Sequence, residues 1–227
     1  MSPRRVPVSR RDRPAKPPLS RDGVVSTALR IMREEGLERV TMRRLAAELD
    51  TGPASLYVYV HNTAELHGAL LDELLFGLAL PLPGTQWRAA AVELLSAYTA
   101  ILHAQPSLAR SVLTLRPSGP NYLRLVDELL GLLLAGGVPV RQAAWGVDLL
   151  LQLATAIAAE QGTRDESAEA DGEVSLQTQS VLEAPEDVYP NLGRTRDELF
   201  SGTVEQRQGW AFEALLNGIA GAPTPDR

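Results

Sequence analysis

Residues 41–60 read TMRRLAAELDTGPASLYVYV and have the layout of two short helices joined by a tight turn. Thr41 is a favoured N-cap residue for the first of these helices. Thr51 and Gly52 indicate the turn, and Pro53 suits the first position of a second helix that runs to residue 60. The stretch therefore predicts a helix-turn-helix.

The apolar residues of this stretch predict how its two helices pack. Leu45 and Leu49 face inward from the first helix, and the small Ala46 allows the second helix to approach closely. Asp50 occupies the turn position that often needs a left-handed backbone, which Asp tolerates better than most residues. Leu56, on the second helix, is expected to fill the angle between the two helices.

The second helix is a poor helix former, because Val58, Val60 and two tyrosines lose rotamer freedom in a helix. Packing must therefore hold it, and Leu56 and Val60 lie one turn apart on the face that can pack. Tyr57 and Tyr59 lie about 200° apart around the helix, so at least one of them should be exposed. Exposed aromatic and hydroxyl groups on a short helix suit the major groove of DNA.

The stretch VTMRRLAAELDTGPASLYVYVHNTAEL, residues 40–66, resembles the DNA-binding region of the tetracycline-repressor (TetR) family. Two positions depart from the family pattern. Asp50 replaces a glycine, and Thr63 replaces a lysine that commonly touches the DNA backbone in the family, a contact for which His61 or the basic N-terminus could substitute. The matching residues are Thr41, Arg43, Leu45, Ala46, Leu49, Leu56, Tyr57, Tyr59, Val60, Asn62 and Leu66.

The resemblance implies a set of DNA contacts. Arg43 is expected at a phosphate or a guanine edge, Ser55 and Tyr59 at bases, and Tyr57 at a phosphate. The alternative for the two adjacent arginines is a solvated helix face with Glu48 as their partner. The full predicted DNA-binding set is Thr41, Arg43, Arg44, Pro53, Ala54, Ser55, Tyr57, Tyr59, His61 and Thr63.

Hydrophobic periodicity predicts helices along most of the chain and no convincing strand, so the expected class is all-α. The resemblance implies that a three-helix helix-turn-helix domain precedes a larger helical bundle for regulation and dimerisation. The predicted divisions are a disordered basic arm at 1–19, a DNA-binding domain at 20–64 and a regulatory domain at 65–222. A mobile acidic loop is expected near 162–190, and helices at about 20–36, 63–79, 86–105, 106–114, 120–135, 140–161 and 203–220.

Charge is distributed unevenly. The whole chain has a net charge of −6, but residues 1–62 carry 12 Lys and Arg against 7 Asp and Glu, a local charge of +5. A basic head on an acidic body is expected if only the head meets phosphate. The arm could follow the DNA backbone or enter a minor groove, or it could be an idle tail. Its basic residues are Arg4, Arg5, Arg10, Arg11, Arg13 and Lys16.

Composition excludes several classes of protein. The chain has 227 residues and no cysteine, so disulfides and thiolate metal sites are excluded. It shows no long uninterrupted apolar run and no signal peptide, so a soluble cytoplasmic protein is expected, with no membrane partner. Paired histidines, Glu-x-x-His and glycine-rich phosphate loops are missing, which argues against an enzyme. The remaining alternative is a helical ligand- or protein-binding module without sequence-specific DNA binding.

A recognition helix of this length reads few bases, so a homodimer on palindromic operator DNA is expected. The resemblance implies that two body helices, 140–161 and 203–220, form the dimer contact, and the alternative is that both belong to the core. The predicted interface residues are Ala143, Val147, Leu150, Leu151, Ala154, Ala158, Trp210, Ala214, Leu215 and Gly218.

The resemblance also implies a pocket for a small-molecule effector inside the body. Ligand binding is expected to move helix 63–79 and to release the protein from its operator, although activation stays open. No cofactor or metal is expected, because the chain has only three histidines and no cysteine. Magnesium–tetracycline is not the expected effector, because the tetracycline-binding members hold it with a histidine near the position of Ala79, where this chain has none. The candidate ligand residues, each of which could instead serve packing, are His103, Arg116, Tyr122, Glu128, Trp145, Asp148 and Gln152.

Overall fold

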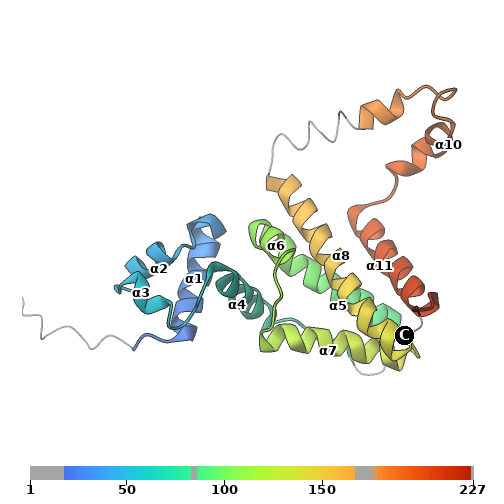
Figure 1. The fold of residues 1–227 in the computed structure, drawn as a ribbon. Helices are drawn as coiled ribbons and strands as arrows, with labels where there is room; N and C mark the ends of the chain where they lie inside the picture. The colour runs from blue at the N-terminus through green and yellow to red at the C-terminus, as the bar shows by residue number, and fades with distance from the viewer. Residues whose placement is uncertain (1–17, 83–85, 167–175, 177, 226–227) are drawn as a thin grey trace, which may run out of the picture.

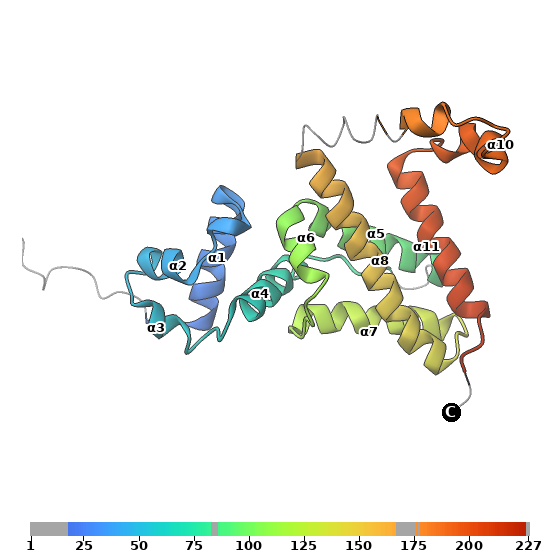
Figure 2. The same cartoon turned by 45° about the horizontal axis from the view of Figure 1, so that its top comes forward.

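The computed structural model describes residues 18–82, 86–166, 176 and 178–225, and all regular elements within these ranges are helices. The predicted all-α class is therefore confirmed. Figures 1 and 2 show a head made of α1, α2 and α3 at one end, a larger body at the other, and α4 between them. Of the predicted arm, all but Pro18 and Leu19 lies outside the described residues.

The head begins with α1 (Arg21–Glu35), whose first turn is capped by Ser20, with its Oγ accepting from the Gly23 N–H at 3.1 Å. The predicted apolar face of α1 is buried. Gly36 follows with a φ of 90°, a conformation that glycine adopts without strain, and leads into a short 3-10 helix that the sequence did not predict, η2 (Leu37–Arg39).

The helix-turn-helix consists of α2 (Met42–Glu48) and α3 (Pro53–Leu56). Thr41 caps α2 as predicted, with its Oγ1 accepting from the Arg44 N–H at 3.1 Å. Asp50 adopts a φ of 49°, which confirms the left-handed turn position. The predicted helix 53–60 is wrong in length: regular α-helix ends at Leu56 and a turn follows, as expected for a segment rich in poor helix formers.

The connecting helix α4 (Thr63–Leu75) begins at Asn62, whose Oδ1 accepts from the Glu65 N–H at 2.8 Å. It ends four residues before the predicted residue 79, because Phe76 takes the cap position and Gly77, a poor helix former, follows. On its way α4 contacts α1 in the head and α5, α6 and α7 in the body.

The body is built from α5 (Trp87–His103), α6 (Pro106–Val112), α7 (Pro120–Ala135), α8 (Val140–Glu166) and α11 (Val204–Gly221). α8 packs against the other four. It contains an 18-residue window with a mean hydropathy of 1.2, and half of that window is buried inside the protein. The apolar character of α8 is therefore explained by its place in the core of the body.

The predicted irregular segment 162–190 is wrong at its start, because α8 continues to Glu166. Gly162 explains the continuation: it is buried, and a Cβ added there would lie 2.7 Å from Pro106, so α8 packs closely on the start of α6. Residues 178–182 are helical, and α10 (Pro190–Leu199), which the sequence did not predict, has no buried residue. Both views show α10 standing away from the body.

Candidate nucleic-acid interface

The short helix α3 is held from beneath by side chains that are completely buried. Leu45 from α2, and Leu56 and Val60 from α3 and the turn after it, all have 0% exposure, and Ala46 is buried beside them. Leu49 packs against the same core from a partly buried position. The predicted internal packing of the helix-turn-helix is therefore confirmed.

The outward side of α3 and the turn after it is exposed. Ser55 lies on this side, and Tyr57 and Val58 are 49% and 74% exposed, whereas Tyr59 packs partly against the core. The expectation that at least one tyrosine is exposed is confirmed. Val58 was not singled out as a contact residue, although its position opposite Leu56 and Val60 was the available signal; its methyl groups suit thymine methyls. Pro53 and Ala54 are exposed on the same helix.

The two arginines at the start of α2 have different surroundings. Arg43 is exposed and makes no hydrogen bond or ion pair with any described residue. Arg44 bonds the carboxylates of Glu35, at 2.8 Å, and Glu48, which Arg30 also contacts. The pKa of Glu48 lies below its ordinary value because it accepts hydrogen bonds from Arg44 and then from Arg30. Arg43 is thus exposed without a partner among the described residues, whereas Arg44 adopts the alternative arrangement with Glu48.

The first turn of α4 follows the turn after α3 in the chain. His61 approaches Glu65 twice: its backbone N–H donates to Oε2 at 2.8 Å, and its Nδ1 lies 2.8 Å from the same oxygen. The backbone N–H of His61, and then its ring, hold the pKa of Glu65 below its ordinary value. The carboxylate therefore binds the N–H of His61 and not, as a capping box requires, that of Asn62. His61 and Thr63 are exposed.

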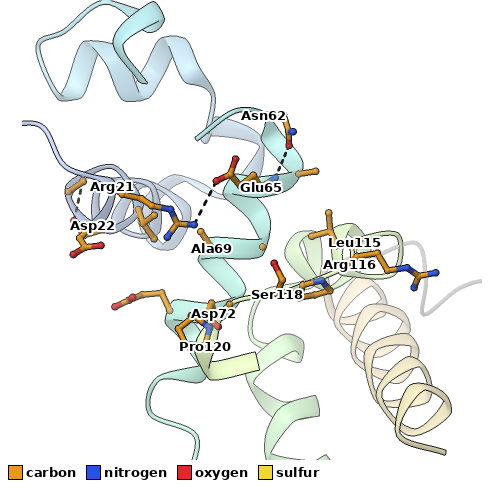
Figure 3. A pocket seen from close by; sticks show the side chains of 18 residues that line it. Arg21, Asp22, Asn62, Glu65, Ala69, Asp72, Leu115, Arg116, Ser118 and Pro120 are labelled. Atoms are coloured by element: carbon orange, nitrogen blue, oxygen red, sulfur yellow. Dashed lines mark hydrogen bonds and ion pairs between the residues drawn. The ribbon is translucent and has the colours of Figure 1, made fainter. Parts of the chain in front are cut away.

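A cleft of about 910 Å³ lies where head and body meet, between the start of α1, one side of α4 and the α6–α7 connection (Figure 3). Arg21 of α1 approaches Glu65 of α4 at 3.9 Å across it. Asp72 of α4 accepts from the Tyr122 N–H at 2.9 Å and from the Asn121 side chain at 3.2 Å. α4 is thus bound to both sides of the junction.

Four of the seven candidate ligand residues, Arg116, Tyr122, Asp148 and Gln152, interact through charge or hydrogen bonds. Burial raises the pKa of the Tyr122 phenol, the charge of Asp148 raises it further, and Arg116 opposes the shift. Gln152 Nε2 donates to Asp148 Oδ2 at 2.6 Å. Asp148 and Gln152 are thus bonded to each other on the exposed side of α8, the charges of Asp148 and Arg116 act on the half-buried Tyr122, and Arg116 also lines the junction cleft.

The other three candidate ligand residues lie elsewhere. His103 Nε2 is 2.7 Å from Asp165 Oδ2, near the end of α8. Trp145 is 54% exposed and lines a hollow of about 130 Å³ between α8 and α11, whereas Glu128 is half-buried on α7. The seven predicted residues therefore do not share one cavity.

A polar pair inside the body was not predicted from the sequence. The Tyr98 hydroxyl of α5 lies 3.0 Å from Thr155 Oγ1 of α8, and both side chains are buried. Because the Thr155 hydroxyl donates to the Leu151 carbonyl at 2.7 Å, Tyr98 is the donor in this pair. Burial raises the pKa of Tyr98. The available signal was the presence of two hydroxyl groups on the apolar faces of these helices.

The predicted dimer residues of α8 are corrected by the structure. Their side chains are at most 5% exposed within the protomer, so they face its own core and are out of reach of a partner: Ala143, Val147, Leu150, Leu151, Ala154 and Ala158. The opposite face of α8 presents Trp145 and Leu149 to solvent. On α11, Trp210 is 72% exposed, Ala214 and Gly218 are exposed and Leu215 is half-buried.

Two family models match the chain. The model described as "Bacterial regulatory proteins, tetR family" matches residues 24–70, and "Tetracyclin repressor-like, C-terminal domain" matches residues 80–221. The first covers α1 to the middle of α4, and the second covers most of the body. Together they span both groups of helices seen in the fold.

Among curated proteins, the HTH-type transcriptional repressor DrrR1 of Streptomyces coeruleorubidus is 38% identical over 127 residues, which are 55% of this chain and 47% of the relative. The tetracycline repressor protein class C of Escherichia coli is 27% identical over 163 residues, 70% of this chain and 74% of the relative. The chain spans about half the length of the first curated relatives that it matches.

Solved structures match over nearly the whole chain. The transcription regulator SCO7704 of Streptomyces coelicolor is 50% identical, with a TM-score of 0.79, over 93% of this chain and 100% of that one. ActR of Streptomyces coelicolor, solved in complex with actinorhodin, is 33% identical with a TM-score of 0.80, over 91% and 99% of the two chains. With both family models and a half-identical structure in agreement, the chain belongs to the TetR family of bacterial regulatory proteins.

Proposed function

We propose that this protein is a transcriptional repressor that binds operator DNA through α2 and α3 and leaves it when a small molecule binds the body. The main observation behind the proposal is the exposed face formed by Ser55, Tyr57 and Val58. Fully buried side chains hold this face in place, and the exposed Arg43 lies on the neighbouring helix α2. The curated relative DrrR1 is described as a repressor. The protein would act in the cytoplasm, where bacterial DNA lies, and would need no enzymatic activity for this function.

The first experiment is a gel shift with the DNA upstream of the protein's own gene. Arg43→Ala should weaken specific binding by about 1–3 kcal/mol, which is roughly five- to 150-fold, because it removes a contact to a guanine edge. Tyr57→Ala, which removes a phosphate contact, should weaken binding to all DNA sequences alike. Arg194→Ala is the matched control for charge, because Arg194 is an exposed arginine of α10 in the body. A folded protein that binds no DNA even at low salt would overturn the proposal and favour a ligand- or protein-binding module.

The salt dependence of binding identifies phosphate contacts. Each lost contact should reduce the slope of log K against log salt by about 0.9. Deletion of residues 1–17 tests the basic arm in the same titration, because the arm contributes only if the slope becomes shallower. An unchanged slope would remove the arm from the proposed interface and leave the contacts of α2 and α3 in place.

A homodimer is proposed through the exposed faces of α8 and α11. Trp145 and Leu149 on α8 and Trp210 on α11 are large apolar side chains with about half or more of their surface exposed, and the small Ala214 and Gly218 would permit close helix approach. Trp210→Glu should shift the mass measured by analytical ultracentrifugation from dimer to monomer. Phe76→Glu is the control, because Phe76 is equally exposed but lies at the end of α4. A wild-type monomer at micromolar concentration would contradict the dimer.

The effector is proposed to bind among Arg116, Tyr122, Asp148 and Gln152. The support is the hydrogen bond between Gln152 and Asp148, the charges of Asp148 and Arg116 that act on Tyr122, and the two solved complexes of the relative ActR, with actinorhodin and with (S)-DNPA. Native mass spectrometry of the purified protein would detect a retained compound. Tyr122→Phe should weaken retention, whereas Tyr189→Phe should not, because Tyr189 is exposed at the start of α10, outside the cluster. Equal effects of both would move the site elsewhere.

A further inference from the structure

The head contacts the body directly through a side-chain hydrogen bond that does not involve α4. Ser107 Oγ, in the first turn of α6, donates to Glu38 Oε1 of η2 at 2.6 Å. η2 packs against α6 at this point. The pKa of Glu38 lies below its ordinary value, first because of the Ser107 hydrogen bond and also because of its own backbone N–H and the charge of Arg110.

Arg110 extends this contact to the end of α8. Its Nη2 donates to Ser107 Oγ at 2.7 Å, and its Nη1 donates to Thr163 Oγ1 at 2.6 Å and lies 3.5 Å from Glu166 Oε2. Ser107 thus accepts from Arg110 and donates to Glu38, so both bonds run in the same direction and each polarises the other. The last turn of α8, α6 and the head are joined by one chain of hydrogen bonds.

The position of η2 makes this contact relevant to DNA. The residues of η2 directly precede α2: the Val40 N–H donates to the Leu37 carbonyl and the Thr41 N–H to the Arg39 carbonyl, both at 2.9 Å. A movement of η2 therefore moves Thr41 and the start of α2, where Arg43 lies. The second attachment of α6 runs through α4, where His67 Nδ1 lies 2.7 Å from Ser111 Oγ.

Two attachment points fix an orientation that a single one leaves free to rotate. We propose that Glu38, Ser107 and Arg110 form a latch that sets the angle of the DNA-binding head on the body, and that the end of α8 holds this latch closed through Thr163 and Glu166. The three residues are positioning residues, since they contact no DNA themselves. The inference rests on the proposed function for its consequence, but the angle can be measured without DNA.

All three latch residues lie at or near the surface, so the latch adds little stability and acts on orientation. Loss of one such hydrogen bond should raise the dissociation constant for operator DNA about three- to tenfold, because the recognition helices of a dimer must match the spacing of the DNA turn. The thermal unfolding midpoint should stay nearly unchanged. A variant that merely unfolds the head would raise the dissociation constant and also lower the unfolding midpoint.

The head–body angle can be tested by double electron–electron resonance. The chain has no cysteine, so Ala47→Cys on α2 and Ala89→Cys on α5, both at exposed positions, give two defined spin-label sites. The doubly labelled chain is diluted into excess unlabelled chain, so that the distance within one chain is measured whether or not the protein dimerises. Glu38→Ala, Ser107→Ala and their double variant are compared with Glu34→Ala, whose carboxylate pairs with Arg30 within α1.

The latch predicts a broader or shifted distance distribution for Glu38→Ala and Ser107→Ala, no further change in the double variant, and a wild-type distribution for Glu34→Ala. Arg110→Ala should resemble the two single variants. Distributions of Glu38→Ala and Ser107→Ala that match wild type would overturn the latch. If the distributions change as predicted but the wild-type protein binds no DNA, the latch stands and the proposed function fails.

Discussion

The head, residues 18–62, and the body, residues 86–225, place polar groups differently. In the head, Leu56 and Val60 are fully buried on one side of α3, while Ser55 and Tyr57 are exposed on the other. In the body, the Tyr98 hydroxyl is buried in the same core that holds the helices together. In the head, the buried side chains that support α3 are therefore separate from the exposed side chains that are proposed to contact DNA. In the body, apolar packing and a buried hydroxyl pair share one interior.

Because of this difference, substitutions in the head and in the body should affect DNA binding and stability in different ways. A change on the exposed side of α3 should alter DNA binding at little cost in stability, because the support beneath it is untouched. A polar change inside the body should alter stability and ligand response together, because each buried hydroxyl needs its partner. Substitutions in the two regions therefore test whether support and function are separate in the head and combined in the body.

The largest expected effect is the loss of the support in the head. Leu56→Ala removes a fully buried side chain and should lower the free energy of unfolding by about 2–5 kcal/mol. Leu150→Ala, equally buried in α8, is the matched change in the body. Thermal unfolding followed by circular dichroism should show similar losses, with DNA binding lost in Leu56→Ala at temperatures where most helix remains. Equal loss of DNA binding in both variants would contradict a separate support in the head.

The next effect concerns the buried hydroxyl pair of the body. Thr155→Val removes the acceptor of the Tyr98 hydroxyl and leaves that group buried without its partner, which should cost about 1–3 kcal/mol. Tyr98→Phe should cost less, because the Thr155 hydroxyl keeps its bond to the Leu151 carbonyl. The double variant should be less destabilised than the sum of the two, as measured by urea unfolding. Additive losses would mean that the two hydroxyls do not depend on each other.

The head could be predicted from the sequence because its signals are local. Thr41, Asp50 and Leu56 carry cap, turn and packing information within a few residues, and the structure confirms all three. The predicted α8 dimer residues failed for the opposite reason. The apolar face of a long helix looks the same whether its own body or a partner covers it, and only the tertiary structure shows that Ala143 and Leu150 face inward.

Contacts between distant segments also escaped prediction. Tyr98 and Thr155 are 57 residues apart, and Ser107 and Glu38 are 69 residues apart, so no local pattern links them. The short α10 has no buried residue and thus lacks the periodic burial on which helix prediction depends. Local features could therefore be predicted from the sequence, whereas contacts between distant segments could be seen only in the folded structure.

A smaller effect is expected at the turn of the head, where Asp50 has a φ of 49°. Asp50→Ala and Asp50→Gly both remove the carboxylate and differ in the Cβ that disfavours the left-handed region. Asp50→Ala should therefore be about 1 kcal/mol less stable than Asp50→Gly, as measured by chemical denaturation. Equal stability of the two variants would mean that the turn relaxes to another conformation and that the geometry between α2 and α3 is less fixed than the buried support suggests.

The smallest effect lies at the boundary of the two regions, in the pH response of His67. Burial lowers the pKa of this half-buried imidazole from its ordinary value of 6.5, so the folded protein binds fewer protons there than the unfolded chain. The free energy of unfolding should therefore fall as the pH is lowered from about 7.5 to about 5.5, where the unfolded chain takes up a proton first. Glu35 and Glu48, whose pKa values are lowered from 4.5, stay charged in this window. His67→Gln should show a weaker dependence in urea unfolding at the two pH values; an unchanged dependence would assign the pH response to groups other than this contact between α4 and α6.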